Sequence, residues 1–160
     1  MIQPDRFLNM EGLKMSKFVV RSADQRRADI QERARIIGVD EAYISTLVGI
    51  FYQRIRKDEV LGPIFNEAID DWGPHLEKMK KFWSAVALNT GAYSGRPVPA
   101  HQKLSSVTSD HFARWLALFK ETLEDTAPTP QAVDYFMERA ERIAKSLQLA
   151  TVTNPPQRSS

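Results

Sequence analysis

The fold is decided by the stretch Asp71-Trp72-Gly73-Pro74-His75-Leu76-Glu77-Lys78-Met79-Lys80-Lys81-Phe82-Trp83-Ser84-Ala85-Val86-Ala87. As a helix it gathers an apolar, aromatic face with one imidazole at its N-terminal end: His75, Met79, Phe82, Trp83 and Val86. Leu76, Lys80 and Ala87 fall beside this face or opposite it. The pattern suits a wall lining a flat apolar ligand. It also suits an ordinary core helix whose histidine lies at the rim, and the pattern alone favours this second interpretation.

Similar stripes flank this helix on both sides. Apolar spacing and caps predict helices from Asp40 to Lys57, from Thr108 or Ser109 to Asp125, and from Thr129 to Gln148. A polar, arginine-rich segment before them predicts a surface helix, with Asp24 as a possible N-cap and Gly38 as its end.

Between these helices lie two segments rich in turn residues. Gly62-Pro63 predicts a turn within residues 61–65, followed by two residues of buried type. Residues 91–99 predict a loop, and His101 follows on a segment with room for one or two helical turns. No stretch alternates with period two, so the fold class is all-α. Four substantial helices and the short segment with His101 build the expected core.

Domain organisation follows from these boundaries. We expect an N-terminal extension over residues 1–38, partly helical, one domain over 39–150 and a disordered tail over 151–160. Residues 1–38 hold eight Lys/Arg and five Asp/Glu, a balance of +3, against −1 for the other 122 residues. The main domain is near neutral and shows no nucleic-acid footprint. No apolar run nears the roughly 18 residues of a membrane span, so a cytoplasmic protein is expected.

Composition narrows the chemistry. The chain has no cysteine and three histidines, His75, His101 and His111, which make a poor zinc site. No phosphate-binding glycine loop or nucleophile elbow occurs. A haem iron needs one axial imidazole, an apolar box and a few polar donors, which His101 and the wall tipped by His75 could supply. Histidine near a loop is also typical of a surface or helix-end contact.

Five ordered fragments resemble the truncated haemoglobins, specifically group III. They lie within residues 43–148: Ile50-Phe51-Tyr52 with Arg56-Lys57-Asp58, Leu61-Gly62-Pro63-Ile64-Phe65, Trp72 to His75 with Phe82-Trp83, Gly95-Arg96-Pro97 to His101, and Phe112-Ala113-Arg114-Trp115-Leu116. The resemblance implies a shortened globin of two-over-two helices around haem b.

The family's roles fall on matching positions. His101 is similar to the proximal ligand of the iron, and Tyr52 to the distal tyrosine that donates to bound oxygen. Trp115 is similar to the tryptophan whose indole N–H faces the ligand. His75 resembles the distal histidine, which gates the pocket or binds iron as a sixth ligand.

Other matched positions are expected to form the pocket or the core. Met79 should narrow the pocket flexibly, and Lys78 could meet a haem propionate or simply face solvent. Four aromatic residues are assigned to pocket or core packing without a choice between the two: Phe51, Phe65, Phe82 and Trp83.

The resemblance implies a globin that reversibly binds dioxygen and other diatomic gases. Two distal donors would hold oxygen tightly, which favours nitric oxide oxidation or peroxide chemistry over transport, with an unidentified redox partner. We expect a monomer or weak homodimer. The alternative is a haem-free helical sensor or interaction module, whose packed core would leave no flat cavity between Tyr52, Met79, Trp115 and His101.

Overall fold

The computed structural model describes residues 22–91 and 107–153, with side chains as far as 150. All regular structure within these ranges is helical, which confirms the all-α prediction. The helices are α2 (Ala23–Ile36), α3 (Glu41–Lys57), α4 (Leu61–Ala68), α5 (Trp72–Leu88), α7 (Ser109–Thr126) and α8 (Pro130–Thr153).

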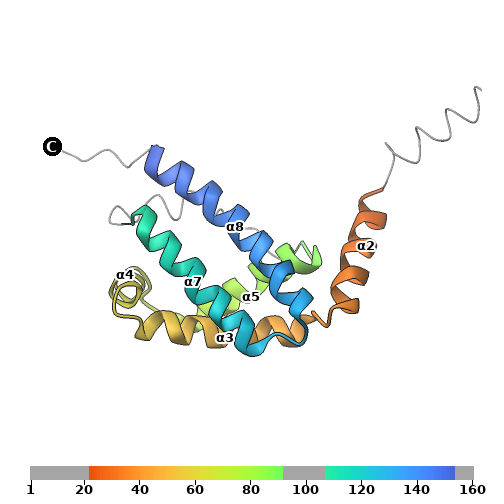
Figure 1. The fold of residues 1–160 in the computed structure, drawn as a ribbon, viewed down its shortest axis with the longest axis horizontal. Coiled ribbons are helices and arrows are strands. Elements are labelled where there is room, and N and C mark those ends of the chain that lie inside the picture. The colour runs from red at the N-terminus through yellow and green to blue at the C-terminus, as the bar shows by residue number, and fades with distance from the viewer. Residues whose placement is uncertain (1–21, 92–106, 154–160) are drawn as a thin grey trace, which may run out of the picture.

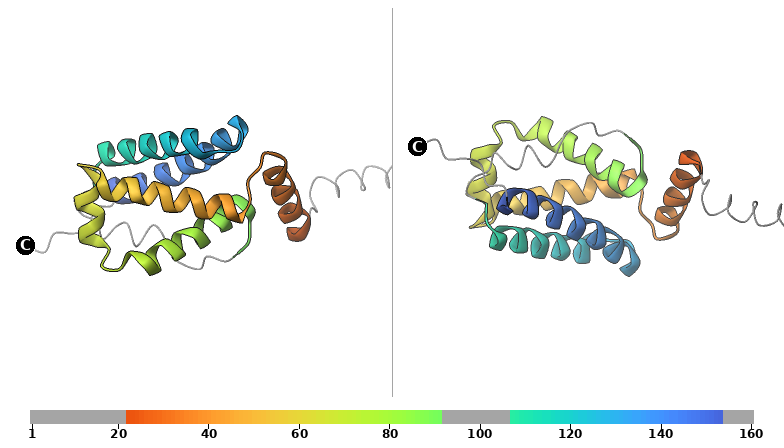
Figure 2. Two further views of the ribbon diagram at one scale, coloured as in Figure 1. Left: turned by 90° about the horizontal axis from the view of Figure 1, so that it is seen from below. Right: turned by 90° about the horizontal axis from the view of Figure 1, so that it is seen from above.

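Helix α3 runs through the middle of the molecule. It packs against α4, α5 and α7, and α7 in turn packs against α8. In Figure 2, α5 covers one side of α3 while α7 and α8 cover the other. Helices α2 and α4 stand at opposite ends of this arrangement in Figure 1. The core therefore lies between two helix pairs, α3 with α5 and α7 with α8.

Local sequence signals set the ends of the principal helices. The Asp40 side chain accepts from the Tyr43 N–H at the start of α3, and Asp71 accepts from the Gly73 N–H at the start of α5. Asn89 ends α5 in the left-handed conformation, with φ of 53°. Thr129 accepts from the Ala132 N–H in the first turn of α8, whose first residue is Pro130. These four helices begin as predicted, although α8 continues to Thr153 rather than ending near Gln148.

The prediction of a turn at Gly62-Pro63 is wrong, because these residues lie inside α4. The Asp58 carboxylate accepts from the N–H groups of Val60 and Leu61, and its carbonyl accepts from the Gly62 N–H. Pro63 then falls in the first turn, where a helix needs no N–H donor. A Gly-Pro dipeptide, which is common in turns, is thus also compatible with the first turn of a helix.

Helix α2 is capped by Ser22 rather than by Asp24. Ser22 and Gln25 bond reciprocally as a capping box, which leaves Asp24 in the first turn. Most of α2 is exposed, as expected, but Ala34 is fully buried and Gln31 Nε2 donates to the Leu88 carbonyl at 3.0 Å. Figure 1 shows α2 at the end of the molecule, where it docks against α5.

Aromatic rings fill the centre of the core. Trp83 stacks on Phe119 with 5.0 Å between centroids, and Phe119 stacks on Trp115 at 5.3 Å. The buried face of α5 consists of Trp83, Ser84, Ala87 and Leu88. Of the predicted apolar face, Trp83 is buried and His75, Met79, Phe82 and Val86 are half-buried, whereas Ala87, expected beside that face or opposite it, is fully buried.

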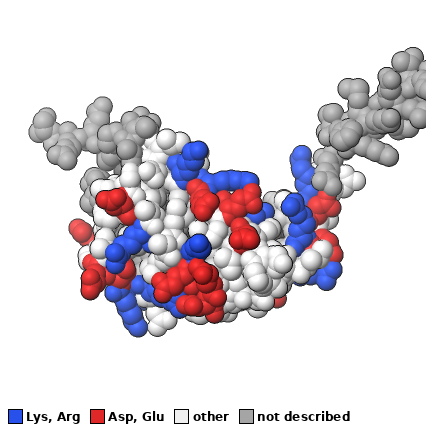
Figure 3. Space-filling view, viewed as in Figure 1, with Lys and Arg blue, Asp and Glu red and all other residues white. Residues whose placement is uncertain are grey.

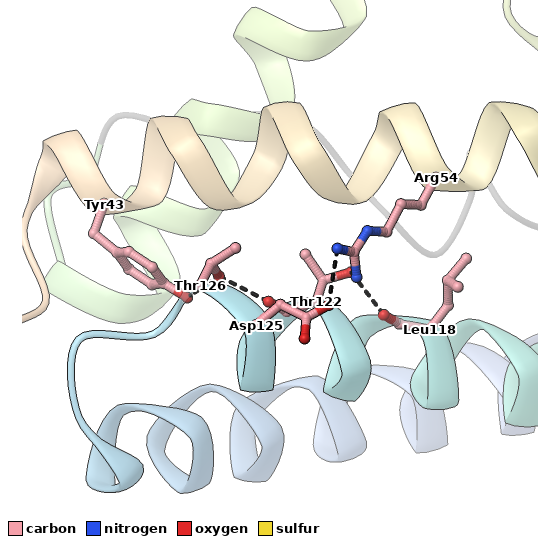
Figure 4. A network of polar contacts seen from close by, with 6 residues as sticks. All are labelled: Tyr43, Arg54, Leu118, Thr122, Asp125 and Thr126. Carbon is pink, nitrogen blue, oxygen red and sulfur yellow. Dashed lines mark hydrogen bonds and ion pairs between the residues drawn. The ribbon is translucent and has the colours of Figure 1, made fainter.

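A polar seam joins α3 to α7, and Figure 4 shows its six residues. Arg54 pairs with Asp125 at 2.9 Å and also donates to Thr122, whose hydroxyl donates to the Leu118 carbonyl. Nearer the start of α3, Tyr43 bonds Thr126 at 2.9 Å. Thr122 is fully buried, yet its hydroxyl has partners on both helices, so the seam fixes their register without an unsatisfied group.

The surface carries both signs of charge. Basic and acidic side chains alternate over the face seen in Figure 3. Within the described ranges, no helix is both long enough and apolar enough to span a bilayer.

Candidate functional site: an aromatic cluster around Tyr52

Tyr52 lies at the centre of a cluster of rings contributed by α3, α4 and α5. It is 5 % exposed, and its ring meets Phe65 at 6.4 Å, Trp72 at 6.0 Å and His75 at 5.6 Å between centroids. No residue of the described ranges forms a hydrogen bond with its hydroxyl. Burial raises the pKa of Tyr52 well above its ordinary value of 10.0, so the phenol keeps its proton. The site thus presents an O–H donor that the described protein itself does not use.

His75 projects from the first turn of α5 toward this phenol. Its ring is half-buried and stands edge to face against both Tyr52 and Trp72, at 5.6 Å in each case. Met79 and Phe82, one and two turns further along α5, are also half-buried. The three side chains share one stripe of α5, and its imidazole end contacts the Tyr52 ring.

Trp115 reaches the same cluster from α7. It is half-buried, lies edge to face with Phe51 at 5.3 Å and stacks on Phe119. Phe51 also contacts Tyr52 at 5.1 Å, so it touches both residues that were predicted to be distal donors. Trp115 belongs to the same continuous ring network as Tyr52 without touching it directly.

The structure divides the predicted aromatic residues into two groups. Phe51 and Trp83 are core residues, with exposures of 0 % and 1 %. Phe65 and Phe82 are half-buried at the edge of the core. Lys78 is exposed on α5, and His111 accepts from the Thr108 N–H at the start of α7. His101 and the loop before it lie outside the described residues.

Three residues around His75 had been given no role. Trp72 lies three positions before it on α5, Asn66 lies on α4, and Arg56 lies near the end of α3. The spacing of Trp72 and His75 predicts a contact on one helix face. The contribution of Arg56 and Asn66 depends on the path of α4, which the sequence signals had misread as a turn.

A polar hollow of about 290 Å³ lies elsewhere, between α3 and α5. Its lining is largely charged or hydroxylic: Glu41, Ile44, Ser45, Glu77, Lys80, Lys81, Ser84 and Thr90. Ser84 donates to Glu41 at 2.5 Å across it. The α5 residues involved lie on the side of the helix away from His75. This hollow does not suit an apolar ligand, and the cluster around Tyr52 is the better candidate site.

Within the described ranges, no group of three histidine, aspartate or glutamate side chains is placed to hold a metal ion. The polar side chains that do lie together here are the Tyr52 phenol and the His75 imidazole, whose rings are in contact among apolar rings.

Comparison with known proteins agrees with this arrangement. The family model for the bacterial-like globins matches residues 35–149. The group 3 truncated hemoglobin ctb of Campylobacter jejuni is 35 % identical over 114 residues, which cover 69 % of this chain and 89 % of that protein. The chain belongs to the group III truncated haemoglobins. The crystal structure of the group III truncated hemoglobin from Campylobacter jejuni superposes with a TM-score of 0.65 over the same shares of the two chains.

Membership of this globin family has two direct consequences. The two helix pairs are the two-over-two arrangement of a shortened globin, as the sequence predicted. Globins bind haem, so this globin is a haem-binding protein. The residues around Tyr52 suit such a group, because they combine an apolar stripe with one protonated phenol on a buried residue.

Proposed function

We propose that this globin binds haem b beside the Tyr52 cluster and reversibly binds dioxygen and other diatomic gases there. The observation that carries the proposal is the Tyr52 side chain, which is 5 % exposed among aromatic rings and whose hydroxyl donates to none of the described residues. A protonated phenol in apolar surroundings offers one hydrogen-bond donor, and a bound oxygen ligand would accept from it.

His101 is the proposed axial ligand, and the half-buried stripe of α5 is the proposed distal wall. When bound, haem supplies an iron that holds one imidazole and one diatomic gas. Met79, Phe82 and Phe65 would pack against the apolar macrocycle. Lys78 would lie near a propionate at the exposed edge. Phe51 and Trp83 support this wall from within the core.

Tyr52 and Trp115 set the preference for the ligand. Each side chain carries one hydrogen-bond donor, and a donor favours a ligand with partial negative charge over an apolar one. Oxygen held by two donors leaves slowly. Slow release suits a reaction of the held oxygen, such as nitric oxide oxidation to nitrate, or a peroxide reaction, more than oxygen delivery. Electrons would then come from a redox partner protein.

His75 has two possible positions in this proposal. Its ring contacts Tyr52, so it lies close enough to the pocket to serve as its gate or to reach the iron as a sixth ligand. A neutral imidazole is required for the second role. The spectrum of the reduced protein distinguishes the two positions, because a sixth protein ligand makes the haem low-spin before any gas is added.

Absorption spectroscopy of protein expressed with ample haem tests the proposal. We expect a sharp Soret band that shifts when carbon monoxide is added to the reduced protein. His101→Ala should lose the haem on gel filtration, whereas the matched variant His111→Ala should keep it, because His111 only caps α7. A folded protein without a Soret band, or equal haem retention in both variants, would favour the haem-free sensor or interaction module.

The proposal also covers the cellular location, the oligomeric state and the small-molecule partner of this globin. We place this globin in the cytoplasm as a monomer or weak homodimer, with dioxygen as its small-molecule partner. Analytical ultracentrifugation of the haem-loaded protein tests the oligomeric state.

A further inference from the structure

A second aromatic ring, Trp72, packs beside both His75 and Tyr52. Trp72 stands perpendicular to the imidazole, with 90° between the ring planes and 5.6 Å between centroids. Tyr52 also stands against the imidazole, at 88° and the same distance. Trp72 and Tyr52 are themselves 6.0 Å apart, so the three rings close a triangle. The indole therefore contacts both members of the His75–Tyr52 pair, and the imidazole cannot swing toward the Trp72 side unless the indole moves first.

The indole is held by two neighbours from other helices. Its Nε1–H donates to Asn66 Oδ1 at 3.2 Å, and the Arg56 guanidinium lies over its ring, 4.8 Å from the centroid. Asn66 Nδ2 in turn donates to the Arg56 carbonyl at 3.4 Å. Trp72 is therefore tied to the end of α3 and to α4 as well as to its own helix.

These contacts do different physical work. The hydrogen bond to Asn66 fixes the direction in which the indole edge points. The guanidinium covers the ring face and attracts it, because a cation is stabilised over the negative face of an indole. Trp72 is half-buried and stands at the start of α5, where fewer contacts restrain a side chain than in the core. The contacts with Asn66 and Arg56 therefore hold the Trp72 side chain in one rotamer, although its place at a helix end would otherwise leave it free to adopt others.

We infer that Trp72, anchored by Arg56 and Asn66, is a positioning residue that holds the His75 imidazole against Tyr52 and so controls entry to the pocket. The inference rests on the proposed function for the pocket itself. It adds that the position of the His75 ring is fixed by the contacts of Trp72, which join α3, α4 and α5. Trp72 acts through His75 and needs no contact with haem or gas.

Flash photolysis of the carbon monoxide complex measures the effect on entry. Trp72→Leu should raise the bimolecular association rate constant by about three- to tenfold, the range expected from losing an aromatic pair and its anchoring hydrogen bond. Trp72→Phe and Asn66→Ala should give smaller increases, because each loses the indole hydrogen bond and keeps a ring beside His75. Two exposed neighbours provide controls, Lys57→Ala beside Arg56 and Glu67→Ala beside Asn66. Both should leave the rate constant unchanged.

A double-mutant cycle separates positioning from direct blockage. On a His75→Leu background, Trp72→Leu should change the association rate less than about twofold, because its effect passes through the imidazole. An equal increase on both backgrounds would show that the indole itself blocks the entrance and would overturn the inference. So would an unchanged rate for Trp72→Leu in the presence of His75.

A readout that does not need haem keeps this test apart from the test of function. NMR of the protein as isolated, with the His75 ring protons assigned through His75→Gln, should show contacts between His75 and the Trp72 indole. Asn66→Ala should shift the His75 ring signals while Glu67→Ala leaves them in place. If the protein bound no haem but showed the contacts between His75 and the Trp72 indole, only the proposed function would be refuted. If the protein bound haem but showed no contacts between His75 and the Trp72 indole, only the inference about Trp72 would be refuted. Circular dichroism and the urea midpoint of each variant establish that it folds.

Discussion

Asp58 and Arg114 form a two-pronged ion pair, with Nε to Oδ2 at 2.7 Å and Nη2 to Oδ1 at 3.0 Å. The same carboxylate accepts from the Val60 and Leu61 N–H groups at the start of α4. One side chain thereby joins the end of α3, the start of α4 and the part of α7 that precedes Trp115. The Asp58 side chain is 11 % exposed and that of Arg114 is 44 % exposed, so water reaches the ion pair from the Arg114 side.

Removing the Asp58 side chain should destabilise the fold. Asp58→Ala should lower the free energy of unfolding by about 2 kcal/mol, near the upper end for a lost capping side chain. Asp58→Asn should cost less, because an amide oxygen still accepts from the α4 backbone while the pairing charge is gone. Urea unfolding followed by circular dichroism measures both. Arg114→Gln is the matched control, since it removes the pair and leaves the cap; equal losses in Asp58→Ala and Arg114→Gln would contradict a capping contribution.

The Asp58 pair should also give stability a defined pH dependence. The Arg114 hydrogen bond, followed by those of the Leu61 and Val60 N–H groups, holds the pKa of Asp58 below its ordinary value of 3.8. A carboxyl whose pKa is lowered in the folded state stabilises fully above its unfolded pKa, and this contribution is lost as the pH falls through the folded pKa. The difference between wild type and Asp58→Asn should therefore be present at about pH 7 and shrink below about pH 3.8. A difference that stays constant into strong acid would exclude the carboxylate as its source.

Replacing Tyr52 should separate ligand binding from stability. Tyr52→Phe should speed dioxygen dissociation by about 10- to 100-fold, the loss expected for a hydrogen bond to a charged acceptor. The free energy of unfolding of the haem-free protein should stay within about 1 kcal/mol or rise, because the described residues give the hydroxyl no partner to lose. Stopped-flow kinetics and urea unfolding measure the two effects. An unchanged off-rate together with a large loss of stability would identify Tyr52 as a structural residue.

Gly62 should tolerate no side chain. A Cβ there would lie 2.7 Å from the Arg56 carbonyl oxygen and 3.3 Å from that of Ile55, so α4 would have to move away from the end of α3. Gly62→Ala should cost about 1–3 kcal/mol, the usual penalty for overpacking. Gly49→Ala in α3 is the matched control, because a Cβ there meets nothing within 4 Å. It should stabilise by about 0.5–1 kcal/mol, since alanine favours a helix interior. Similar effects of the two variants would contradict a close approach at Gly62.

The sequence predicts those parts of the fold that local signals determine. Helices α3, α5, α7 and α8 each carry an apolar stripe and an N-terminal signal, so their positions follow from the chain alone. Helix α4 was missed because its start depends on Asp58, a side chain outside the apparent turn. The degree of burial along α5 could not be predicted from the sequence, because Ala87, one turn after Trp83, is fully buried while Phe82 and Val86 stay half-buried at the edge of the core.

The candidate site divides in the same way. Tyr52, His75 and Trp115 were assigned through a family resemblance, and the structure brings the rings of Tyr52 and His75 into contact. The contacts of Trp72 with Asn66 and Arg56 cross the corner formed by α4. No periodicity within one helix encodes a corner, so these residues could not be placed from the sequence.

The stack of Trp115, Phe119 and Trp83 has a mechanical consequence. Neighbouring rings in it are inclined by 10° and 20°, so the stack runs nearly parallel from the edge of α7 to the fully buried centre. A ligand that displaced the Trp115 side chain would push it against Phe119, and Phe119 against Trp83. The close packing around Trp83 leaves no space into which these rings could move. Met79, on α5, is a half-buried and unbranched side chain that can change rotamer. The pocket thus has a stiff side and a compliant side, and a bulkier guest would be accommodated by displacement of α5 side chains while α7 keeps its shape.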